Sequence, residues 1–106
     1  MVLNLLVGEM KTVDSRPSDA ANNKPAFVKP GTLGNTGTQW FPQTPGICSV
    51  APTGPEGVFG EVTGTGVGTS VVNIRGLAVD DTEVITPFTV NVAVGKLDHY
   101  DPIVLP

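Results

Sequence analysis

The segment from Thr86 to Val94 alternates between apolar side chains and polar or small ones. Successive side chains of a β-strand point to opposite faces, so this period of two predicts a strand with one buried face and one solvated face. The segment from Thr69 to Arg75 has the same period. A chain with two such strands needs a second layer to cover their apolar side, which comprises Val72, Ile74, Phe88, Val90, Val92 and Val94.

Weaker strand patterns recur along the rest of the chain, separated by segments rich in Gly, Pro and Asn. They cover residues 3–7, 11–16, 26–28, 38–41, 47–50 and 58–62. No segment combines a helical period with helix start and stop signals. Short strands with a turn every 8–12 residues or so are typical of a sandwich or barrel. We therefore expect an all-β sandwich of about seven antiparallel strands over residues 1–94, followed by an extended C-terminal arm, residues 95–106.

Two stacked sheets would bury the inward side chains of these strands. We expect a core of Leu3, Leu5, Trp40, Val50, Val58, Val62, Val72, Ile74, Phe88, Val90 and Val92. The 106 residues are enough for one domain with a single modest core. Cys48 is the only cysteine, so no internal disulfide forms and the fold depends on packing, which fits synthesis in a reducing cytoplasm.

Charge and the terminal segments narrow the class of partner. The formal net charge of −4 argues against nucleic acid, because binding phosphates requires a surplus of Lys and Arg. The apolar start at residues 1–7 lacks a basic region and a cleavage site, and it is too short to span a membrane. We expect no membrane partner, and a complete gene product rather than a module cut from a longer protein.

The stretch from Trp40 to Arg75 resembles the group-2 bacterial immunoglobulin-like domain. In that family a Trp ends one strand. A "Ser-Val-Ala" type strand, a Pro/Gly turn and an alternating strand come next. A Gly-rich turn then precedes the sequence "Gly-Thr-Ala-Thr-Ile". The matching residues here are Trp40, Ser49-Val50-Ala51, Pro52-Thr53-Gly54, Gly57-Val58, the run Val62–Thr69 and Val72-Asn73-Ile74. The polar run from Arg16 to Pro25 is similar to the turn after the family's second strand. Phe41–Pro45 departs from the family's Ser-rich step, and residues 25–37 are longer than the family pattern.

The resemblance implies an immunoglobulin-like sandwich and a binding role. Members occur as repeats in bacterial adhesins and on the heads and tails of tailed phages. A free-standing copy is more similar to the phage case, so we expect a virion protein, made in the host cytoplasm, that decorates or cements the capsid. Its partners would be the major coat protein or other virion subunits, in a homo-oligomer or symmetric array. The alternatives are a tail-associated accessory protein and a carbohydrate- or host-surface-binding module using Phe27, Phe41 and Tyr100.

Four segments were weighed for chemistry, and each favours a structural interpretation. The run Gly64–Ser70 lacks the Lys of a phosphate loop and precedes a strand rather than a helix, so we expect a hairpin turn there. Asp98–Asp101 contains the chain's one His, too few ligands for a metal, and Asp80, Asp81 and Glu83 offer too few oxygens for Ca²⁺. Cys48 fits a small buried side chain better than a nucleophile. We expect no enzyme, catalytic residue, cofactor or metal.

The C-terminal arm is the strongest candidate for binding. Its apolar side chains are costly to leave in water, and the residue before Pro102 favours an extended backbone. Phe41 points away from Trp40 on the same strand, and exposed aromatic residues are enriched at interfaces. The predicted partner-binding residues are Phe41, Leu97, Tyr100, Ile103, Val104 and Leu105.

Overall fold

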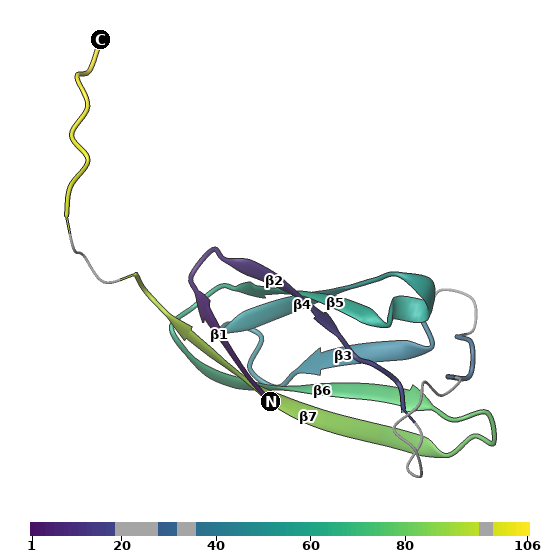
Figure 1. The fold of residues 1–106 in the computed structure, drawn as a ribbon. Coiled ribbons are helices and arrows are strands. Elements are labelled where there is room, and N and C mark those ends of the chain that lie inside the picture. The colour runs from purple at the N-terminus through teal and green to yellow at the C-terminus, as the bar shows by residue number, and fades with distance from the viewer. Residues whose placement is uncertain (19–27, 32–35, 96–98) are drawn as a thin grey trace.

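The chain folds into two stacked β-sheets with a projecting C-terminal segment (Figure 1), as seen in a computed structural model that describes residues 1–18, 28–31, 36–95 and 99–106. One sheet has the order β1-β7-β6-β3 and the other has the order β2-β5-β4. The strands are β1 (Val2–Leu6), β2 (Met10–Asp14), β3 (Thr38–Pro42), β4 (Cys48–Thr53), β5 (Phe59–Gly64), β6 (Gly68–Leu77) and β7 (Glu83–Ala93), with a short 3₁₀ turn at Pro55–Gly57.

The prediction of an all-β sandwich is confirmed. The three-strand sets β3-β6-β7 and β2-β5-β4 have the same order as the C-F-G and B-E-D strands of an immunoglobulin-like sandwich. Four of the five strand pairs are antiparallel, and the exception is β1, which runs parallel to β7 from Val2 beside Thr89 to Leu6 beside Ala93. The two strands come from opposite ends of the chain, so no tight turn forces them to run in opposite directions.

Two expectations about strand limits need correction. Val94 was expected on the buried face, but β7 ends at Ala93 and Val94 is exposed. The expected strand at residues 26–28 is only an isolated bridge between Val28 and Ala78, while Ala26 and Phe27 lie outside the described residues.

The core lies between the two sheets, where the alternating faces meet. Its buried apolar residues are Leu5, Trp40, Cys48, Val62, Val72, Phe88, Val90 and Val92, and Leu3, Val13, Ile47, Val50 and Ile74 pack partly buried against them. The Trp40 and Phe88 rings meet edge to face with centroids 6.1 Å apart. Val58 was expected in this core, but it follows the 3₁₀ turn, outside the strands, and is only half-buried.

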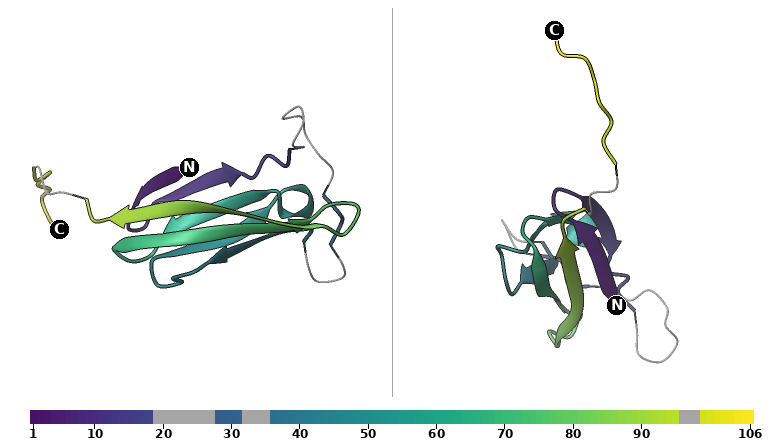
Figure 2. Two further views of the ribbon diagram at one scale, coloured as in Figure 1. Left: turned by 90° about the horizontal axis from the view of Figure 1, so that it is seen from below. Right: turned by 90° about the vertical axis from the view of Figure 1, so that its left-hand side faces the viewer.

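The sheets differ in length, and this difference positions the candidate sites. β6 and β7 have 10 and 11 residues, whereas β2, β4 and β5 have 5 or 6. The shorter sheet therefore leaves the hairpin end of β6 and β7 uncovered, and Figure 2 shows these two strands extending past their neighbours. The C-terminal segment leaves from the other end of β7 (Figure 1).

Candidate interaction surfaces

The described part of the C-terminal arm, residues 99–106, lies apart from the sandwich as an extended chain (Figure 1). Every residue in it is exposed, and Val104 retains 97% of its accessible surface. Tyr100, Ile103 and Leu105 are likewise exposed, and Leu97 lies outside the described residues. The described arm residues Tyr100, Ile103, Val104 and Leu105 thus form an exposed segment with no cover from the sandwich.

Phe41 lies on β3 with its side chain on the outer face, as alternation with Trp40 predicted. Phe41 is 49% exposed, whereas Trp40 is 7% exposed. Phe41 and Tyr100 belong to separate elements, and among the described residues the one ring pair found is Trp40 with Phe88. The structure does not bring the predicted aromatic residues together in a sugar-binding platform, and Phe27 is not among the described residues.

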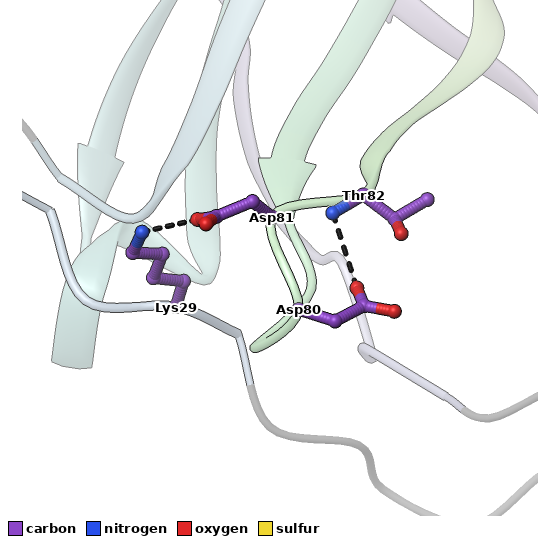
Figure 3. Close-up of polar contacts among 4 residues, drawn as sticks. All are labelled: Lys29, Asp80, Asp81 and Thr82. Atoms are coloured by element: carbon purple, nitrogen blue, oxygen red, sulfur yellow. Dashed lines mark hydrogen bonds and ion pairs between the residues drawn. The ribbon is translucent and has the colours of Figure 1, made fainter.

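The acidic residues of the β6–β7 hairpin each have a separate structural partner (Figure 3). Asp80 accepts the backbone N–H of Thr82 at 3.1 Å, and hydrogen bonds from the Thr82 side chain and backbone lower the pKa of Asp80. Asp81 pairs with Lys29, and Glu83 pairs with Arg75 at 2.8 Å. Over the described ranges, no group of three His, Cys, Asp or Glu side chains is arranged to hold a metal ion.

The glycine-rich run Gly64–Ser70 connects β5 of one sheet to β6 of the other, so the predicted hairpin turn is wrong, because these two strands do not pair with each other. The backbone N–H groups of Thr65 and Gly66 both donate to the carbonyl of Ile47, and the Thr65 hydroxyl donates to Gly46. The amides of Thr65 and Gly66 are therefore already hydrogen-bonded within the protein. Cys48 is fully buried, and burial raises the pKa of its thiol, which keeps it protonated. Asp98 lies outside the described residues, and His99 Nε2 lies 3.4 Å from Asp101 within the arm.

The outer edge of β1 is blocked by side chains. The Val7 N–H donates to Ala93 of β7, so the polar groups of Asn4 and Leu6 face away from β7. Glu9 occupies both outward backbone groups of Leu6. Its carboxylate accepts the Leu6 N–H at 3.1 Å, and its own backbone N–H donates to the Leu6 carbonyl. Lys11 Nζ donates to the carbonyl of Asn4 at 3.2 Å. An incoming strand would have to displace these contacts.

The outer edges of β3 and β4 each carry a proline. The Gln43 N–H donates to Val71, so alternation along the β3–β6 pair turns Pro42 toward the outer edge. The Thr65 N–H donates to Ile47, which likewise turns Pro52 outward on β4. Proline has no N–H to donate, so both edges resist the addition of a strand.

Two stretches of strand edge stay open in the described residues: the outer edge of β2, and residues Glu83–Pro87 of β7, which we call the open half of β7. β1 pairs with β7 only from Thr89 to Ala93. The Ala78 N–H donates to Thr82, and alternation from this pair turns the polar backbone groups of Glu83 and Ile85 away from β6. Within the described part of the chain, no strand pairs with them on that side, and Ile85 is 52% exposed.

A groove of about 350 Å³ adjoins the open half of β7 on its inner face, and we call it the end groove. Ile74, Gly76, Val84 and Thr86 form its floor, where β6 and β7 run past the shorter sheet. Residues 15–18, Val28, Thr38, Leu77 and Ala78 complete its lining. Ser15 contributes a buried hydroxyl with no hydrogen-bond partner. The end groove was not predicted from the sequence, although the apolar pair Val84-Ile85 ahead of the alternating segment was a signal.

The chain has no match among the protein families, the curated proteins or the solved structures with which it was compared. In the described residues no helix is long and apolar enough to cross a membrane.

Proposed function

We propose that the protein is a structural component of a tailed-phage particle, a capsid decoration or cement protein that binds neighbouring subunits through its C-terminal arm. The observation that supports this proposal is the arm itself. Its apolar side chains at Ile103, Val104 and Leu105 are exposed, although burying each against a partner would stabilise the complex by about 1.5–3 kcal/mol.

The sandwich suits a passive role in such an assembly. Its core is continuous between the two sheets, and the outer edges of β1, β3 and β4 are blocked by side chains or prolines, so these edges resist unplanned strand pairing. A rigid body with one adhesive segment can join subunits that a shell repeats by symmetry. Many weak contacts repeated in this way act together, which raises the total strength of attachment.

Co-sedimentation with capsids assembled from the coat protein encoded in the same genome tests the proposal. We expect the full chain to bind, and deletion of residues 96–106 to abolish binding. The double substitution Ile103→Asp/Leu105→Asp should act in the same way, whereas Val67→Asp, which alters an exposed valine in the β5–β6 turn, should not. Equal occupancy of capsids by the full and arm-deleted proteins would contradict the proposal, as would binding to tail structures alone.

A further inference from the structure

We propose that the C-terminal arm of one copy binds the open half of β7 in a second copy, as an added strand whose side chains enter the end groove. This inference rests on the proposed function, because it names the surface that receives the arm. It links copies of this chain to one another, in addition to any contact with coat subunits.

The backbone of the two partners is complementary. The open half of β7 presents the N–H and carbonyl of Glu83 and Ile85 and the carbonyl of Pro87. The arm is extended, and because alternate N–H groups of a strand point to the same edge, it can supply those of Ile103 and Leu105, between Pro102 and Pro106. Extended segments bind exposed sheet edges through such main-chain hydrogen bonds, and alternate side chains fill pockets beside the edge.

The side chains of the arm match this geometry. In a strand, Ile103 and Leu105 share one face and Val104 lies on the other. If Ile103 and Leu105 face inward, they extend the apolar floor formed by Ile74 and Val84 in the end groove. Val104 then lies on the outer face, beside the exposed side chain of Ile85. Every large apolar side chain in residues 103–105 gains a neighbour.

Two polar features of the end groove also point to an incoming segment. The hydroxyl of Ser15 is buried without a hydrogen-bond partner, and a buried polar group normally has one. Arg16 lines the same groove, and the Asp101 carboxylate of the arm is 91% exposed. An arm that enters the groove brings a negative charge toward Arg16 and backbone groups toward Ser15.

The topology favours a second copy over the arm's own sandwich. The arm leaves after Ala93, while the open half of β7 lies toward the other end of the same strand, about 20 Å away at Pro87 and about 33 Å away at Glu83. To reach it, the arm would have to reverse and cross β1, which occupies the intervening edge. A contact between opposite ends of two copies is heterologous, so it generates rings or chains of subunits, the kind of connection that a shell array requires.

Sedimentation velocity of two complementary variants tests the inference. In Ile85→Pro the only backbone group removed is an N–H that β6 does not use, so the acceptor is blocked and the arm is intact. Deletion of residues 96–106 leaves the acceptor intact and removes the arm. We expect the wild-type protein to assemble with increasing concentration, each variant to associate at least about tenfold more weakly, and their equimolar mixture to form a 1:1 dimer.

Circular dichroism and thermal unfolding check that Ile85→Pro is folded, and Ile85→Lys replaces it if it is not. Val67→Asp, outside both partners, should assemble as the wild type does. A wild-type protein that stays monomeric, or a mixture that forms no dimer, would overturn the inference. If the protein stays monomeric but still needs the arm to bind capsids, the inference is wrong and the proposed function is supported. If the protein assembles through the arm but does not bind capsids, the proposed function is wrong and the inference is supported.

Discussion

The indole N–H of Trp40 donates to the backbone carbonyl of Gly57 over 2.8 Å, inside the sandwich. Trp40 is on β3 of one sheet, and Gly57 ends the 3₁₀ turn that leads into β5 of the other sheet. The bond therefore joins the two layers at the end of the core. Gly57 has a φ of +69° and is buried, so this position favours glycine, both for its backbone and for the space beside Thr36 and Thr38.

Replacing Trp40 with Phe should lower the free energy of unfolding by at least about 1–3 kcal/mol. The substitution leaves the Gly57 carbonyl buried without a donor, and an unsatisfied buried group carries a cost of that size. It also removes ring atoms that pack against the core. Urea unfolding monitored by circular dichroism measures the change, and an unaltered midpoint would show that the bond does not stabilise the fold.

Gly60 allows the same indole ring to approach the backbone of β5. A Cβ at this position would lie 2.9 Å from Trp40 Cδ2. Gly60→Ala should therefore lower the free energy of unfolding by about 1–3 kcal/mol through overpacking. Gly46→Ala is the matched control, because a Cβ there meets no atom within 4 Å. Equal unfolding midpoints for the two variants would contradict the packing argument.

Alternation predicted the interior of the sandwich but not its ends. Phe88, Val90 and Val92 are buried as their period of two required, and Trp40 and Phe41 divide between inside and outside as expected. Alternation identifies the apolar face of a strand, but it does not reveal whether another sheet covers that face. Ile74 was therefore expected in the core, whereas it is only partly buried against the core and also lines the end groove, which was not predicted.

The alternating pattern also did not predict the direction of β1 or which strand edges stay unpaired. The residues of β1 have the same alternation whether they pair with β7 in parallel or antiparallel, and only the three-dimensional path of the chain decides. The open half of β7 results from the difference in strand length, because the five residues of β1 cover only part of the eleven-residue β7. In contrast, an extended arm after the last strand was predicted from the sequence, and its residues Ile103 and Val104 are exposed to solvent.

Glu56 should make stability depend on pH in the acidic range. Its carboxylate accepts the backbone N–H groups of Gly31 at 2.7 Å and Gly37 at 2.8 Å, and these bonds lower its pKa from the ordinary value of 4.5. A group whose pKa is lowered by folding stabilises the native state above its unfolded pKa, and loses that effect as the pH falls through the folded pKa.

The comparison with Glu56→Gln isolates this effect, because the amide keeps a neutral acceptor in place of the charged one. We expect the wild type to be the more stable protein at about pH 7, and the difference to shrink below about pH 4.5 as the carboxylate is protonated. Urea unfolding of both proteins across this range is the measurement. A difference that stays constant or grows as the pH falls would show that the two glycine amides do not stabilise the charged form.

The prolines of the outer edges should limit self-association to the arm. Pro42 and Pro52 occupy positions whose backbone nitrogen faces away from the paired strand, so threonine fits there without breaking a native hydrogen bond. Each Pro→Thr substitution adds one outward N–H to an edge, which makes that edge able to accept a strand. In the arm-deleted background, the double variant Pro42→Thr/Pro52→Thr should scatter more light with increasing concentration than Pro45→Thr, which alters the loop between β3 and β4. Equal scattering would mean that features other than the prolines keep these edges apart, and that the selectivity of the arm for the open half of β7 has a different origin.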